Sequence, residues 1–86
     1  MIAPRSTRVH ILLFASYAER LGLDRLEAAL PSGATVADAL DYLRALPGGA
    51  DLPPRPLCAR NLAHVSTDAR LADGDELAVL PPLAGG

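Results

Sequence analysis

The sequence has 86 residues, a net charge of −2, one cysteine and no tryptophan. A chain of this length buries only about 60–65% of its unfolded surface, so we expect one small domain without a separate catalytic domain. The acidic balance excludes the basic stripe that nucleic-acid binding requires, and a single cysteine excludes an internal disulfide or a cysteine zinc site. With no leader and no apolar run of membrane-spanning length, we expect a soluble, cytoplasmic protein without membrane contact.

The N-terminal residues predict an extension followed by a strand. Residues 1–8 carry no apolar pattern and are expected to be flexible. The run Val9–Ala15 is almost continuously apolar, which predicts a central strand covered on both faces, one of them by a partner.

A short helix and a second strand are expected next. In Ser16–Gly22, Ser16 is a candidate N-cap, Glu19 completes a capping box and Gly22 ends the helix. Alternating apolar and polar residues over Asp24–Leu30 predict a strand antiparallel to the first.

The main helix is predicted to begin after Thr35, with Asp38 as the acidic partner of a capping box. Pro47-Gly48-Gly49 ends it, and the proline-rich segment Ala50–Pro56 predicts a surface loop. Apolar residues recur at helical spacing on one stripe, at Val36, Ala39, Leu40, Leu43 and Leu46 or Pro47.

The C-terminal third predicts three short strands. Leu57–Arg60 and Ala63–Ser66 flank a turn at Asn61-Leu62, and Asp73-Gly74-Asp75 marks the turn into the last strand, Glu76–Leu80.

This order of elements is that of an α+β protein with a β-grasp fold, a mixed sheet packed on one main helix. The first and last strands would pair in parallel at its centre. We expect the β-grasp domain to span residues 9–80, followed by an extended tail over 81–86.

Residue types that carry chemistry do not gather into a catalytic group. His10 and His64 fall on different predicted strands without a carboxylate or cysteine at metal-ligand spacing, so no metal site is expected. Cys58 lies in an apolar strand and is expected to be a small buried residue rather than a nucleophile. Asp73 and Asp75 flank a turn glycine, where carboxylates usually accept hydrogen bonds from the backbone.

The tail is the remaining candidate site. Two prolines prevent further strand pairing and keep the chain extended, and two glycines leave the final carboxylate without steric cover. The carboxylate of Gly86 is therefore the expected reactive group. Fully extended, the tail spans about 20 Å, enough to enter the active site of another protein. Its residues are Pro81, Pro82, Leu83, Ala84, Gly85 and Gly86.

The strand pattern also predicts a docking face. One helix can cover only one side of the sheet, and we assign Ile11, Leu13, Leu77 and Val79 to that side. Leu12, Phe14 and Leu80 are then left as an apolar cluster on the open side, beside the root of the tail. Exposed clusters of this kind often mark interaction sites, so these three residues are the predicted partner-binding residues.

The tail Pro81–Gly86, preceded by Asp73-Gly74-Asp75-Glu76 and a turn at Asn61, resembles the MoaD-type small subunits of molybdopterin synthase, sulfur carriers of the ThiS/MoaD ubiquitin-like family. The resemblance extends over most of the chain from Val9 onwards. It implies that an adenylating enzyme of the ubiquitin-activating type uses ATP to form an acyl-adenylate at Gly86. A sulfur donor, such as a cysteine desulfurase or a rhodanese, then converts the adenylate to a thiocarboxylate.

The same resemblance implies that the carrier delivers sulfur inside the large synthase subunit, in a heterotetramer, to cyclic pyranopterin monophosphate. The carrier would be a non-catalytic subunit without a stably bound cofactor, because the catalytic residues lie on the large subunit. Three alternatives stay open: a carrier for thiamine-thiazole or another thiocarboxylate pathway, a ubiquitin-like modifier joined to lysines through Gly86, and a passive interaction module.

Overall fold

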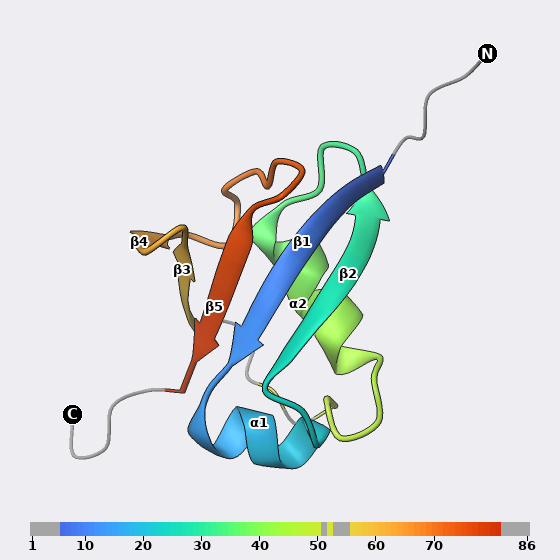
Figure 1. Cartoon of the computed structure of the whole chain (residues 1–86), viewed down its shortest axis with the longest axis vertical. Coiled ribbons are helices and arrows are strands. Elements are labelled where there is room, and N and C mark those ends of the chain that lie inside the picture. Colours follow the sequence, from blue (N-terminus) through green and yellow to red (C-terminus); the bar gives the residue numbers. More distant parts are fainter. Residues whose placement is uncertain (1–5, 51, 53–55, 82–86) are drawn as a thin grey trace.

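A computed structural model describes residues 6–50, 52 and 56–81. They form a five-stranded mixed sheet of order β2-β1-β5-β3-β4, with two helices (Figure 1). In chain order the elements are β1 (Ser6–Leu13), α1 (Ala15–Leu21), β2 (Arg25–Pro31), α2 (Val36–Arg44), β3 (Leu57–Arg60), β4 (Ala63–Val65) and β5 (Glu76–Leu80).

The centre of the sheet is the parallel pair of β1 and β5, in which Ile11 lies opposite Leu77 and Leu13 opposite Val79. β2 pairs antiparallel with the other edge of β1, and β3 pairs antiparallel with β5. Both central strands end near α1 (Figure 1). This arrangement is the predicted β-grasp fold.

The first strand begins earlier than predicted, at Ser6 instead of Val9. Residues 6–8 pair with β2, and the backbone N–H of Arg8 donates to Oδ1 of Asp73 at 2.8 Å. Thr7 is buried, although its polar side chain gave no apolar signal. The expectation of a flexible extension over 1–8 is therefore wrong for residues 6–8, which belong to the sheet. Residues 1–5 lie outside the described residues.

The start of α1 corrects the expected Ser16 cap and the capping box with Glu19. The helix begins at Ala15, its N-cap is Phe14, and no side chain caps it. The chain leaves β1 through Ala15 in a left-handed conformation, with φ of 52°, which places Ser16 already inside the first turn. Gly22 ends the helix as predicted, with φ of 74° and its N–H donating to the carbonyl of Ala18.

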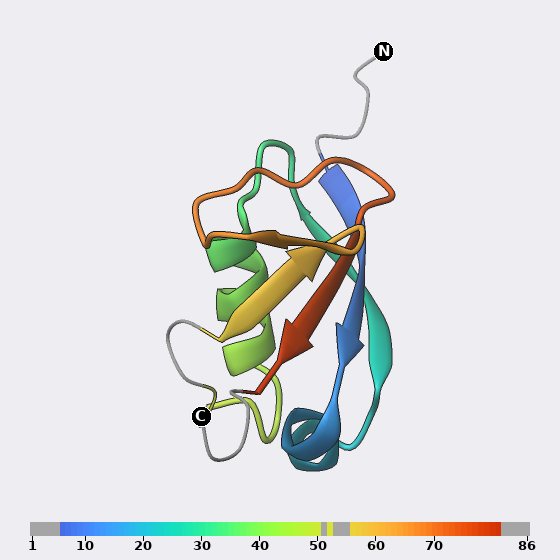
Figure 2. The same cartoon turned by 90° about the vertical axis from the view of Figure 1, so that its left-hand side faces the viewer.

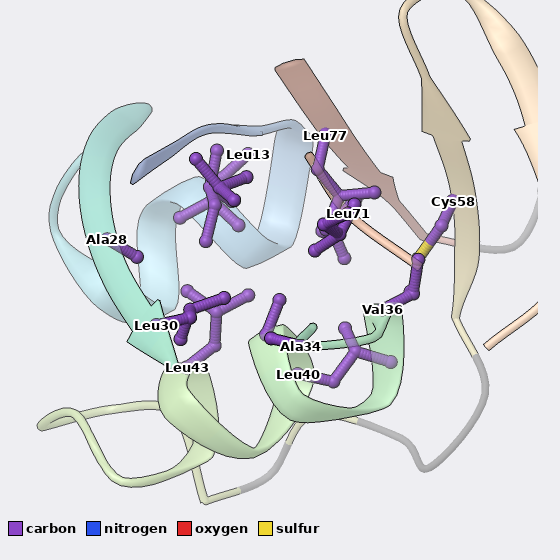
Figure 3. Packing of buried hydrophobic residues seen from close by; sticks show 14 of the residues in the cluster. Leu13, Ala28, Leu30, Ala34, Val36, Leu40, Leu43, Cys58, Leu71 and Leu77 are labelled. Atoms are coloured by element: carbon purple, nitrogen blue, oxygen red, sulfur yellow. The ribbon is translucent and has the colours of Figure 1, made fainter. Parts of the chain in front are cut away.

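The main helix α2 begins as predicted. Thr35 and Asp38 form a reciprocal capping box, in which the Thr35 N–H donates to Asp38 Oδ2 at 2.9 Å. The helix lies across one side of the sheet (Figure 2). Val36, Ala39, Leu40 and Leu43 of its predicted stripe are buried, and Figure 3 shows Leu40 and Leu43 in one cluster with the sheet residues Leu13 and Leu30. The helix ends at Arg44, with Ala45 as its C-cap, rather than at the predicted stop Pro47-Gly48-Gly49, so Leu46 lies beyond the helix and is half-buried.

The last strands are held together by the two turns. Asn61 and Leu62 both have positive φ, of 50° and 74°, and Asn61 Oδ1 accepts from the N–H of Glu76 at 3.0 Å. Asp75 accepts from Asn61 Nδ2 at 3.0 Å and from the Ala72 N–H at 2.8 Å. The bounds of β3 and β5 agree with the predicted ones, whereas β4 ends one residue earlier, at Val65.

Candidate functional site

The predicted reactive tail begins where β5 ends. Pro81 is described and half-buried, and it follows Leu80 without regular secondary structure. Residues Pro82, Leu83, Ala84, Gly85 and Gly86 lie outside the described residues. The structure therefore describes the surroundings of the tail's first residue.

Strand register brings apolar residues together on the open side of the sheet. Leu80 lies opposite Leu57 of β3. Phe14 follows Leu13, the partner of Val79, and its extended backbone continues the alternation of β1 by one residue. One row away, Leu12 lies opposite Ala78, and Ala78 lies opposite Ala59. We call Leu12, Phe14, Leu57 and Leu80 the open-face cluster.

The cluster is accessible in the isolated chain. Phe14 and Leu57 are 43% and 42% exposed, whereas Leu12 and Leu80 are half-buried. Its outer row, Phe14, Leu80 and Leu57, lies at the end of the sheet where the tail begins. A protein that covered this cluster would also be close to the tail's root.

The opposite side of the same strands forms the core. Ile11, Leu77 and Val79 are fully buried and Leu13 is 3% exposed, which confirms the predicted assignment of the two sides. Leu52, in the predicted loop 50–56, also belongs to the core cluster, and its carbonyl accepts from Arg44 Nε at 3.4 Å. Within the described part of this loop, Leu52 and Pro56 are therefore buried, whereas Ala50 is exposed.

Leu57 was missed by the sequence prediction. Its signal was the alternation with Cys58: if Cys58 points into the core, Leu57 must point to the open side. The structure shows this alternation, with Cys58 2% exposed and Leu57 42% exposed. Its position beside Leu80 depends on the β3–β5 register, which sequence periodicity does not give.

Two further side chains with reactive groups, Cys58 and Tyr17, are buried in the core. Burial raises the pKa of the Cys58 thiol to about 11, so at neutral pH it is a protonated core residue. The Tyr17 hydroxyl is buried without a hydrogen-bond partner among the described residues, and burial raises its pKa. Nowhere in residues 6–50, 52 and 56–81 do three or more potential metal ligands gather.

Charged residues occupy the part of the open side away from the tail. Glu27 of β2 lies 3.6 Å from Arg8 Nε and 3.7 Å from His10 Nδ1 on the neighbouring strand. Glu76 lies opposite His10 on the other neighbour, β5. The open side is therefore apolar near the tail and charged at the far end.

Neither α1 nor α2 could cross a membrane, and no other described segment forms a long apolar helix.

Most of the sequence matches one known protein family. The model of the ThiS family matches residues 11–86, which include both the open-face cluster and the tail. The chain belongs to the ThiS family. The matched region of this ThiS-family chain begins inside β1 and extends through residue 86.

Curated relatives of this ThiS-family chain cover nearly its whole length. A molybdopterin synthase sulfur carrier subunit from Drosophila erecta is 33% identical over 81 residues, covering 91% of this chain and 90% of that protein. One from Arabidopsis thaliana is 33% identical over 82 residues, covering 94% and 85%. Among solved structures, the crystal structure of Haloferax volcanii small archaeal modifier protein 1 superposes on this chain with a TM-score of 0.79. The two sequences are 29% identical, and the match covers 90% of this chain and 99% of that one.

Proposed function

We propose that this protein is the sulfur carrier subunit of a molybdopterin synthase and acts in the cytoplasm. The observation that carries the proposal is family membership together with 33% identity to sulfur carrier subunits along almost the whole chain. An exposed apolar cluster beside the root of the tail supports it, because a carrier must dock its body while its tail reaches a distant active site.

The chemistry follows from the properties of a carboxylate, which is a poor acyl donor because its leaving group would be an oxide. An adenylating enzyme first lets the Gly86 carboxylate attack the α-phosphate of ATP, which releases pyrophosphate and forms an acyl-adenylate. A nucleophilic sulfur of the donor enzyme then attacks the acyl carbon and displaces AMP. When that sulfur is the outer atom of a persulfide, the product is an acyl disulfide, and a thiol must cleave its S–S bond to release the thiocarboxylate and leave a disulfide on the donor. That sulfur is delivered in the large subunit to cyclic pyranopterin monophosphate, where it becomes part of a dithiolene.

The chain's own residues keep this tail available. β5 pairs on both sides, with β1 and β3, so its end is fixed in the sheet. Pro81 has no N–H to continue that pairing. Cys58 is the one cysteine of the sequence. Because it is buried and protonated, its thiol does not compete for an activated acyl group.

The decisive test changes the tail and leaves the body intact. Deleting Gly86, or adding one alanine after it, should abolish ATP–pyrophosphate exchange with the adenylating enzyme and abolish thiocarboxylate formation, measured by mass spectrometry. Thermal unfolding should match wild type, because residues 82–86 follow the last strand. An extended protein that still restores molybdopterin synthesis, with its extra residue shown to be present, would refute the role of Gly86.

A second test concerns the body. In the proposed complex Phe14 is an anchor buried by the large subunit, so Phe14→Asp should weaken binding by several kcal/mol, as loss of an aromatic anchor does. The free energy of unfolding of the isolated chain should change by less than about 1 kcal/mol.

Leu62→Asp is the matched control for Phe14→Asp, because Leu62 is 93% exposed at the opposite end of β3. It introduces the same charge and should leave binding unchanged. If Phe14→Asp unfolds the free protein, or binds the large subunit like wild type, the open-face cluster is not the docking site.

The likeness to small archaeal modifier protein 1 favours a second function, attachment of Gly86 to lysines of other proteins. Both functions use the same activated carboxylate. Isopeptide conjugates that appear in cells with the wild type and disappear on deletion of Gly86 would support the modifier. Rescue of a strain that lacks its molybdopterin carrier, compared with one that lacks its thiazole carrier, separates the two sulfur pathways.

A further inference from the structure

A half-open hollow of about 300 Å³ lies on the open side of the sheet, next to the open-face cluster. Leu12 belongs to both features. The polar side chains that line the hollow are His10 of β1, Arg25 and Glu27 of β2, and Glu76 of β5. A partner that covers Leu12 must therefore also cover, or fill, a small cavity with charged walls.

Only some of the charged side chains around this hollow have a partner of opposite charge. Glu27 lies 3.6 Å from the Arg8 guanidinium and 3.7 Å from Nδ1 of His10. In contrast, no ion pair within the described ranges involves Arg25. Arg25 is exposed and lies directly opposite Leu12 in the β1–β2 register, so it is the charged side chain beside the apolar surface.

Docking on the open-face cluster would remove water from Arg25. A guanidinium that loses water without gaining a partner costs free energy, and truncation of one member of a buried charge pair is strongly unfavourable. Glu76 also lines the hollow, and no ion pair in the described part of the chain involves it, but it lies one row further from the tail, opposite His10 rather than Leu12. Arg25 is therefore the charge whose complement the docking partner must supply.

We infer that the large synthase subunit places a carboxylate in this hollow, where it pairs with Arg25. This inference rests on the proposed function. The apolar cluster supplies most of the contact area, whereas the Arg25 pair fixes the orientation in which the tail enters. A carboxylate is favoured over a phosphate group because the other walls carry two carboxylates, Glu27 and Glu76, which repel a doubly charged anion more strongly.

A second copy of this chain is the competing occupant, since its Glu27 or Glu76 could also pair with Arg25. The net charge of −2 on each copy opposes that association. Sedimentation of the free carrier distinguishes the two: we expect a monomer. A wild-type dimer that dissociates in Arg25→Gln would overturn the assignment to the large subunit.

The experiment compares Arg25→Gln with Arg8→Gln as the matched control. Arg8 lies on the same side of the sheet and has the same charge, but it pairs with Glu27 and does not line the hollow. Binding of each full-length carrier to the purified large subunit is measured by stopped flow or surface plasmon resonance at about 50 mM and about 500 mM salt. Arg25→Gln should slow association about three- to tenfold at low salt, with a smaller effect at high salt, and Arg8→Gln by less than about twofold.

Equal effects of the two substitutions would overturn the inference, and so would an Arg25→Gln effect that does not depend on salt. Phe14→Asp, measured in the same series, separates this failure from failure of the proposed function. If Phe14→Asp abolishes binding while Arg25→Gln matches its control, the docking face stands and the carboxylate partner does not exist. If wild type does not bind the large subunit at all, the proposed function is wrong.

Discussion

The two sides of the sheet are built from alternate residues of the same strands, yet they have opposite relations to water. Ile11 is fully buried under α2, while its neighbour Leu12 is half-buried on the other side; Val79 and Leu80 differ in the same way. The two sides of this apolar run therefore differ: one packs into the core of the chain, and the other stays partly exposed to water. Substitutions on the two sides of the sheet show how far their contributions to stability and to binding are separate.

The largest expected effect distinguishes neighbouring residues of β1. Ile11→Ala removes fully buried methyl groups from the core and should lower the free energy of unfolding by about 3 kcal/mol. Leu12→Ala should lower it by less than about 1 kcal/mol, because that side chain is already partly hydrated.

Urea unfolding of both β1 variants measures the difference, and binding to the large subunit should show the reverse order. Equal losses of stability for Ile11→Ala and Leu12→Ala would mean that the open side contributes to the core.

A second, smaller effect tests the alternation in β3. Cys58→Ser places a hydroxyl in the core and should cost about 1–3 kcal/mol, whereas Leu57→Ser on the open side should cost much less. Because burial raises the pKa of Cys58 to about 11, wild type should react with a thiol reagent at pH 8 far more slowly when folded than in denaturant. Rapid labelling of the native protein would show that the β3 end of the core opens.

A third prediction concerns a residue outside both interfaces. The Ala72 N–H, and to a lesser degree the Asn61 side chain, lower the pKa of Asp75. The folded state therefore favours the charged carboxylate, and this stabilisation is present above the ordinary carboxyl pKa of about 4 and is lost as the pH falls through the lower folded value.

Asp75→Asn should thus cost about 1 kcal/mol at pH 7 and less near pH 3, measured by unfolding at both pH values. Asp24→Asn is the control, because no backbone N–H of the described residues donates to the Asp24 carboxylate. A cost that stays constant with pH would mean that the Asp75 charge has no part in stability.

The smallest expected effect lies where the chain leaves the sheet. Ala15 holds a left-handed conformation that glycine adopts without steric strain, so Ala15→Gly should stabilise the protein by roughly 0.5 kcal/mol. Binding of the large subunit should not change if Phe14 keeps its place. Weaker binding without loss of stability would show instead that the Ala15 conformation positions Phe14 for docking.

Local patterns in the sequence predicted most of the fold. The alternation along β1 and β5 separated the two sides, and Thr35 with Asp38 located the start of α2, because both signals depend on neighbouring residues. The start of α1 was predicted wrongly, because Ser16 has a suitable side chain but the N-cap lies two residues earlier, at Phe14. The start of β1 was missed because Thr7 is polar and buried.

The candidate site was predicted only as far as single strands allow. Phe14, Leu12 and Leu80 follow from the period of two, but Leu57 and Arg25 join them through pairing with β5 and β1, respectively. Register between distant segments is set by long-range packing, which has no local signature. The tail residues 82–86 remain a prediction from the sequence and the family match.

The parallel pair of β1 and β5 also determines when this chain can fold. Its central strands come from opposite ends of the sequence, so the core cannot close until both have been synthesised, and such non-local pairing slows folding. A growing or truncated chain that stops before residue 80 lacks the strand that joins β1 to β3. Incomplete molecules should therefore stay unfolded and accessible to proteases, so the pool of folded carriers consists of molecules synthesised at least to the root of the tail.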